Sequence, residues 1–126
     1  MSKLLLGILV GTTLGLIDGL SALLDGVAAS AMPMVVVGSA FKGLLGGLAA
    51  GLVAQRTPKA VPVLLTGIVV LALVTHPIAG SATLDGTETG PKVPYWRIMA
   101  PGLVVGLITG YACVRYGRRP EPKPAA

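Results

Sequence analysis

Charged side chains are scarce in this chain of 126 residues: Asp, Glu, Lys and Arg make up 12% of it, against 53% hydrophobic residues. A soluble domain carries about 25% charged residues. With half that share and a mean hydropathy of +0.82, the chain cannot cover a globule with a surface that water solvates. The scarcity of charge therefore excludes an ordinary soluble domain and predicts a single domain surrounded by lipid.

Residues that carry chemistry are also scarce. Cys113 is the one cysteine, which excludes an internal disulfide and a cysteine-cluster metal site, and we expect it to pack as a small apolar residue. The single histidine cannot build a metal site alone. The sequence has no phosphate-binding glycine loop and no spacing that suggests a catalytic serine or cysteine. We therefore expect a protein that is not an enzyme and that uses no cofactor.

A net charge of +5 could indicate a nucleic-acid partner. The basic residues, however, lie mostly at the ends of apolar runs, and no soluble basic domain is present. The expected partners are therefore the lipid bilayer and other membrane subunits or further copies of the chain, and not nucleic acid.

Four long apolar runs account for most of the chain, and each is close to the 20 residues or so that a membrane span requires. They predict an all-α, integral membrane bundle of four transmembrane helices over residues 1–117. A basic, proline-rich tail, predicted to be disordered, follows at 118–126. The predicted helices cover about 4–24, 33–54, 60–79 and 95–116. The fourth begins at either Tyr95 or Ala100, since Pro101 would interrupt hydrogen bonding in a helix that starts earlier.

Basic residues are distributed unevenly between the two predicted sides of the membrane. Seven fall on the side of the termini, against Lys92 and the interfacial Arg97 on the other. The seven are Lys3, Arg56, Lys59, Arg115, Arg118, Arg119 and Lys123. Because basic residues concentrate in cytoplasmic segments, both termini are predicted to be cytoplasmic.

Small residues recur every four positions in three of the four helices, which places them on one helix face. These ladders are Gly7, Gly11, Gly15 and Gly19; Ser39, Gly43, Gly47 and Gly51; and Gly102, Gly106 and Gly110. Such faces let membrane helices approach closely, so we expect the first, second and fourth helices to pack through them. The third helix is expected to face lipid or a neighbouring subunit. A rival interpretation is that some of these glycines line a narrow pore.

Four ionisable residues lie inside or at the edge of the apolar runs: Asp18, Lys42, His76 and Arg97. At a rise of about 1.5 Å per residue, Asp18, Lys42 and His76 lie roughly 21, 16 and 24 Å from the cytoplasmic edge, and Arg97 at the outer boundary. The matching depths predict an ion pair between Asp18 and Lys42, with His76 close above it. The pair could clamp two helices, or the residues could form a polar site for a proton, an anion or a small polar solute. Lys42 could also snorkel without a partner.

The segment VPYWRIMAPGLVVGLITGYACVRYG at 93–117 and the segment FKGLLGGLAAGLVAQR at 41–56 resemble the final and second helices of small bacterial four-helix membrane proteins. The resemblance implies a bacterial inner-membrane location and carries over no functional residues. The three ladders, the small mass outside the predicted spans and the basic tail lead us to expect an accessory or structural subunit of a membrane complex, or a homo-oligomer. The alternative is a small oligomeric transporter or channel that uses Asp18, Lys42 and His76.

Overall fold

The computed structural model describes residues 1–26, 29–84, 95–118, 121 and 124. These residues form four helices: α1 (Lys3–Ser21), α2 (Met32–Arg56), α3 (Ala60–Leu84) and α4 (Tyr95–Tyr116). Each helix is long and apolar enough to cross a membrane. The predicted all-α chain with four such helices is therefore confirmed, and the four candidate spans suggest a multi-pass membrane protein.

The observed helix ends differ from the predicted ones at several points. α1 ends at Ser21 because the next residues form turns, and the last of these, Gly26, has a φ of 76° that favours glycine. α3 continues through Pro77 to Leu84, and α4 begins at Tyr95 and contains Pro101. The predicted disorder of the tail at 118–126 falls mostly outside the described residues.

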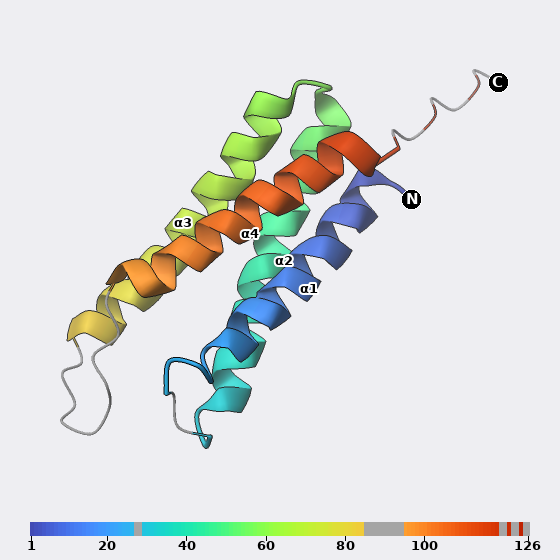
Figure 1. The fold of residues 1–126 in the computed structure, drawn as a ribbon. Coiled ribbons are helices and arrows are strands. Elements are labelled where there is room, and N and C mark those ends of the chain that lie inside the picture. Colours follow the sequence, from blue (N-terminus) through green and yellow to red (C-terminus); the bar gives the residue numbers. More distant parts are fainter. Residues whose placement is uncertain (27–28, 85–94, 119–120, 122–123, 125–126) are drawn as a thin grey trace.

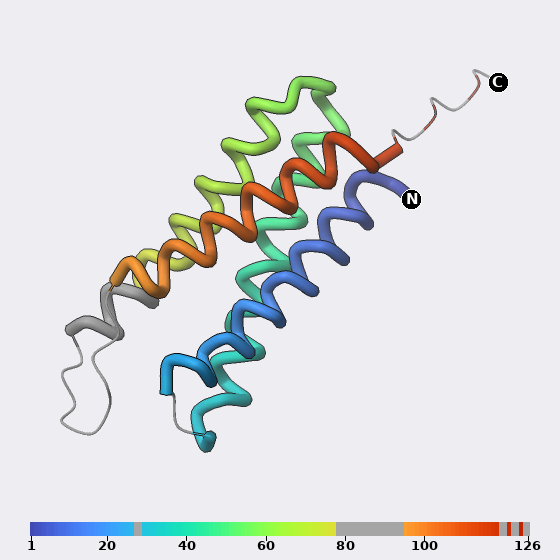
Figure 2. The backbone as a smooth tube through the Cα atoms, viewed as in Figure 1, coloured from blue at the N-terminus to red at the C-terminus, as the bar shows by residue number. Residues whose placement is uncertain are grey.

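The helices form two antiparallel hairpins, one of α1 and α2 and the other of α3 and α4 (Figures 1 and 2). The hairpins meet where α1 and α3 begin and where α2 and α4 end, which we call the closed end. A buried cluster of small side chains joins them there: Ala50, Ala54, Val63 and Cys113. At the other end, which holds residues 22–26 and 29–31 and the start of α4, the hairpins diverge (Figure 1). We call this the open end.

Backbone atoms of α1 and α2 touch where glycine faces glycine. A Cβ atom built on Gly47 would collide with the carbonyl oxygen of Gly7, and one built on Gly43 would collide with that of Gly11. No side chain larger than hydrogen fits at these crossings without a shift of the backbone. The contact fixes α1 against α2 along most of its length.

α3 packs against α4, a contact that the ladders do not predict, and its other side carries the exposed side chains of Val61, Leu65, Val69 and Leu73. A Cβ atom on Gly67 would lie 2.6 Å from the carbonyl oxygen of Gly106, and one on Gly110 would lie 3.1 Å from the Cα atom of Leu64. The glycines at 106 and 110 therefore contact α3 rather than α1 or α2. A helix crossing needs a close approach at only one point, so Gly67 alone is enough on α3.

At the closed end, the start of α1 is hydrogen-bonded to the residues that follow α4. The backbone N–H of Lys3 donates to the carbonyl oxygen of Arg118 at 3.3 Å, and that of Arg118 donates to the carbonyl oxygen of Met1 at 3.1 Å. The thiol of Cys113, buried as expected, lies 3.6 Å from the carbonyl oxygen of Lys3. These contacts hold the start of α1 against the end of α4.

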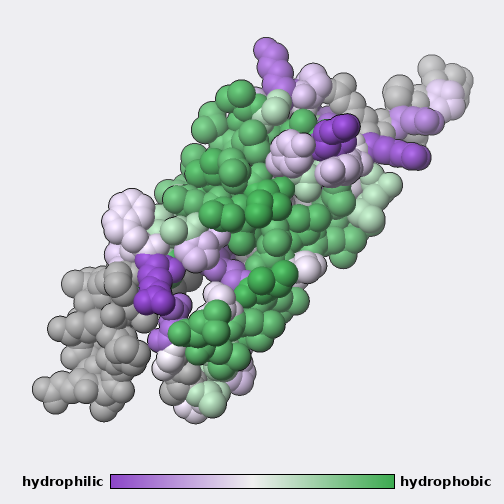
Figure 3. Space-filling view, viewed as in Figure 1, coloured by the Kyte–Doolittle hydropathy of each residue, from purple (hydrophilic) through white to green (hydrophobic). Residues whose placement is uncertain are grey.

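Large apolar side chains cover the outside of the helices, as the hydrophobic surface in Figure 3 shows. Many are more than half exposed, among them Ile17, Val37, Phe41, Val61 and Leu73. An apolar surface this extensive is far larger than the patches that soluble monomers expose. It is compatible with the lipid surroundings that the composition predicts.

Candidate functional site

The hairpins enclose a cavity of about 480 Å³ at the open end, which we call the cleft. Figure 3 shows hydrophilic surface in this hollow, between the hydrophobic surfaces of the two hairpins. All four helices and the turn after α1 contribute to it. The lining residues are Asp18, Ser21, Ala22, Asp25, Met34, Val35, Gly38, Ser39, Lys42, Thr75, Arg97, Ile98 and Pro101.

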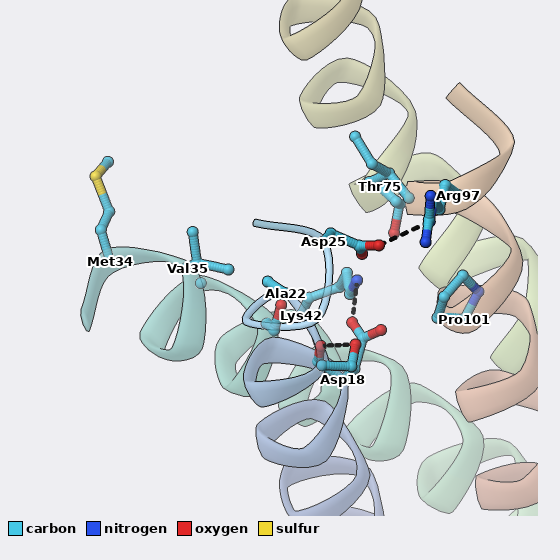
Figure 4. Close-up of a pocket in the computed structure, with 13 residues that line it drawn as sticks. Asp18, Ala22, Asp25, Met34, Val35, Lys42, Thr75, Arg97 and Pro101 are labelled. Carbon is cyan, nitrogen blue, oxygen red and sulfur yellow. Dashed lines mark hydrogen bonds and ion pairs between the residues drawn. The ribbon is translucent and has the colours of Figure 1, made fainter. Parts of the chain in front are cut away.

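Lys42 and Asp18 form an ion pair at the inner end of the cleft (Figure 4), with Nζ 2.8 Å from Oδ2. Their side chains are only 6% and 9% exposed. The close contact of α1 and α2 brings them together, since Gly15 and Gly19, on either side of Asp18, lie against Ser39 and Val36. The depths estimated from the sequence place the same two residues at a similar level.

A second ion pair connects the two hairpins near the mouth of the cleft. The Nε atom of Arg97, on α4, lies 2.7 Å from Oδ1 of Asp25, in the turn after α1. Both side chains are more accessible than the inner pair, at 62% for Arg97 and 22% for Asp25. The sequence singles out Arg97 but does not identify Asp25 as its partner.

His76 lies outside the lining of the cleft, so the expectation that it sits close above the Asp18–Lys42 pair is corrected. Its Nδ1 atom is 2.7 Å from the hydroxyl oxygen of Tyr95, and the two rings meet edge to face. Successive residues of an α-helix point about 100° apart. On α3 it is therefore the preceding residue, Thr75, that faces the cleft.

Thr75 is 1% exposed, and its hydroxyl has no hydrogen-bond partner among the described residues. Thr66, on the same helix, instead donates to the carbonyl oxygen of Pro62 at 2.7 Å, which is a common arrangement for threonine inside a helix. In Figure 4 the Thr75 hydroxyl points toward the part of the cleft that holds Arg97 and Asp25. No sequence signal distinguishes Thr75 from the other helical threonines.

Gly102, on α4, lies close to the Thr75 hydroxyl and the Lys42 ammonium group, although it is not among the residues that line the cleft. A Cβ atom at this position would lie 3.2 Å from the Thr75 hydroxyl oxygen and 3.7 Å from Lys42 Nζ. The hydroxyl and the ammonium group therefore face the same small volume. This ladder glycine lies beside Thr75 and Lys42, whereas Gly106 and Gly110 lie against Gly67, Leu64 and Val63 of α3.

The exposed pair of Arg97 and Asp25 should contribute little to stability. We expect Arg97→Gln to lower the free energy of unfolding by less than about 1 kcal/mol, because solvent screens exposed ion pairs. Thermal unfolding of the purified protein in mild detergent measures the change, with Asp25→Asn as the matched variant. A loss as large as that from breaking the inner pair would contradict this expectation.

The cleft offers hydrogen bonds and paired charges within apolar walls. Among the described residues, no three His, Cys, Asp or Glu side chains are grouped where they could hold a metal ion. Such an arrangement can bind an organic molecule that has polar and apolar parts. A search for similar proteins finds no family model, no curated protein and no solved structure that matches this chain.

Proposed function

We propose that this chain is a non-enzymatic protein of the bacterial inner membrane that binds a small solute with a polar part in its cleft and moves it as a transporter. The observation that carries the proposal is the Asp18–Lys42 pair, which is nearly buried and also lines the cavity. Ionisable groups inside a membrane are costly and commonly mark a solute or ion pathway. A pair that only clamped two helices would not need the cavity.

The uneven distribution of basic residues supports the proposed orientation. The start of α1, the end of α2 and the end of α4 lie at the closed end and carry Lys3, Arg56 and Arg115. With this end cytoplasmic, in agreement with the positive-inside rule, both termini are cytoplasmic and the cleft opens on the opposite side. A solute would then enter from outside the cell.

The glycine contacts support a role within the chain for the ladders that the sequence singles out. Gly7 and Gly11 face Gly47 and Gly43 of the same chain, and Gly106 faces Gly67. We propose that this packing holds the hairpins rigid around the cleft. The role of accessory subunit or homo-oligomer rests on the ladders, on the small mass outside the predicted spans and on the basic tail. Because the ladder glycines contact helices of the same chain, they support that role less than the cleft supports solute binding.

Accessibility of the cleft to water provides the test. In a Cys113→Ala background, Gly38→Cys places a thiol on the lining of the cleft, where nothing lies within 4 Å of the added Cβ. Its neighbour Val37 is 68% exposed but outside the lining, so Val37→Cys places a matched thiol toward lipid. We expect a membrane-impermeant maleimide, added outside intact cells, to label Gly38→Cys at least about tenfold faster, because a thiol in hydrocarbon does not ionise readily.

Equal, slow labelling of both variants would contradict an open cleft. Purification of the unsubstituted protein in mild detergent completes the test. Stable isolation with a large membrane complex would favour the accessory role, whereas a protein that purifies alone or as a small oligomer agrees with a transporter.

A further inference from the structure

We infer that the cleft binds a zwitterionic lipid headgroup that carries a primary ammonium and a phosphate, as in phosphatidylethanolamine. The inference rests on the proposed role of the cleft in binding and transport, and it takes the bound molecule to be a lipid whose headgroup is the polar part, rather than a small free solute. It follows from the charge balance of the lining, from an unpartnered hydroxyl, from the absence of aromatic lining residues and from the apolar walls.

Among the described residues, the charges that line the cleft sum to zero. Lys42 and Arg97 contribute two positive charges, and Asp18 and Asp25 contribute two negative charges. A simple anion or cation would leave an uncompensated charge in a poorly hydrated space, which is unfavourable. A ligand with one positive and one negative group can replace water at both kinds of side chain without changing the balance.

The anionic group of the ligand has a defined place. The ion pair with Asp18 occupies one of the three N–H groups of Lys42, and the Thr75 hydroxyl has no partner among the described residues. Lys42 and Thr75 both line the cleft. A phosphate oxygen at this point would accept hydrogen bonds from the ammonium group and the hydroxyl, which satisfies both donors.

The cationic group must itself donate hydrogen bonds. Asp18 and Asp25 offer carboxylate oxygens, which accept hydrogen bonds from a primary ammonium. A quaternary ammonium has no N–H and is recognised instead by aromatic side chains. None of the described residues that line the cleft is aromatic, so an ethanolamine head suits the cleft better than a choline head.

The apolar walls favour a lipid over a free headgroup. Met34, Val35, Ile98 and Pro101 line the cleft, and a small zwitterion would leave them in contact with water. The volume of about 480 Å³ exceeds what a headgroup alone fills and lies in the range of ligand pockets. The upper parts of the acyl chains would cover these walls and continue toward the apolar outer surface.

Native mass spectrometry in mild detergent tests the inference with three lipids that share two oleoyl chains: phosphatidylethanolamine, phosphatidylcholine and phosphatidylglycerol. We expect the ethanolamine lipid to bind about tenfold more tightly than either of the others, the effect of one or two charge-assisted hydrogen bonds. Thr75→Val should reduce this preference severalfold. Thr109→Val removes a hydroxyl that is also buried and unpartnered but lies outside the lining, so this control should retain it.

Equal binding of the three lipids, or preference for phosphatidylglycerol, would overturn the inference. Competition by free phosphoethanolamine at the same concentration as the lipid would overturn the assignment to a lipid, because the chains would then contribute nothing. The outcomes also separate the two proposals. Fast labelling of Gly38→Cys without headgroup preference overturns only the lipid class, whereas slow labelling overturns the open cleft itself.

Discussion

Gly47→Ala is expected to lower the free energy of unfolding by about 1–3 kcal/mol, the usual effect of forcing a methyl group into a tightly packed contact. The added Cβ would meet the Gly7 carbonyl group, with the carbonyl carbon 2.7 Å away, and would lie 3.2 Å from the Cα atom of Gly11. These are backbone atoms, so no side-chain rotation can relieve the contact and α1 must move away from α2. Thermal unfolding in mild detergent, followed by the loss of monodisperse protein, measures the change.

Gly38→Ala is the matched control on the same helix. Nothing lies within 4 Å of a Cβ atom at this position, and alanine has a better helix propensity than glycine by about 1 kcal/mol. The control should therefore be neutral or stabilising. Equal destabilisation by both substitutions would mean that helix propensity, and not contact between backbones, determines the result.

The four helices could be predicted because hydropathy and length are local properties of the sequence. Apolar runs close to 20 residues long have few alternatives in a chain with so little charge. The turn at residues 22–26, where α1 ends at Ser21, was not anticipated because Leu23 and Leu24 continue the apolar run. Hydropathy alone does not mark a helix end that lies within an apolar segment.

The packing of α3 against α4 could not be predicted from the four-residue spacing of small residues. The close contact there depends on Gly67, an isolated glycine among branched residues. A single small residue carries no periodic signal, although it is sufficient for one crossing. The sequence therefore indicated the α1–α2 contact, which is repeated at several turns, and missed the α3–α4 contact.

The residues of the cleft likewise include some that the sequence predicts and some that it does not. Opposite charges at similar depths on consecutive helices, Asp18 and Lys42, are a signal that one-dimensional reasoning can use. The rotation of α3 that directs Thr75 inward and His76 toward Tyr95 depends on how the hairpins meet, which no short segment encodes. The partner of Arg97 was missed for another reason, since Asp25 lies in a turn whose position depends on where α1 ends.

Lys42→Met is expected to have the largest effect on stability, a loss of about 3–5 kcal/mol, the range observed when one member of a buried ion pair is removed. The substitution keeps an unbranched side chain but leaves the carboxylate of Asp18, whose side chain is 9% exposed, without its cation. Asp18→Asn should be less harmful, because a lysine can extend toward water. The same unfolding measurement in mild detergent compares the two variants, and a loss below about 1 kcal/mol for Lys42→Met would mean that water already stabilises both charges.

The double variant Asp18→Asn with Lys42→Met separates a structural from a functional role of the pair. Removing both charges leaves no isolated ion, so the double variant should be more stable than Lys42→Met alone, as expected for residues in direct contact. If the pair only clamps α1 to α2, this variant keeps the preference for phosphatidylethanolamine. If the pair contributes to the site, the variant remains folded and loses the preference, because the ammonium that binds the phosphate and the carboxylate that binds the headgroup amine are both absent. We expect the second result, since Lys42 and Asp18 line a cavity that a clamp between two helices does not require.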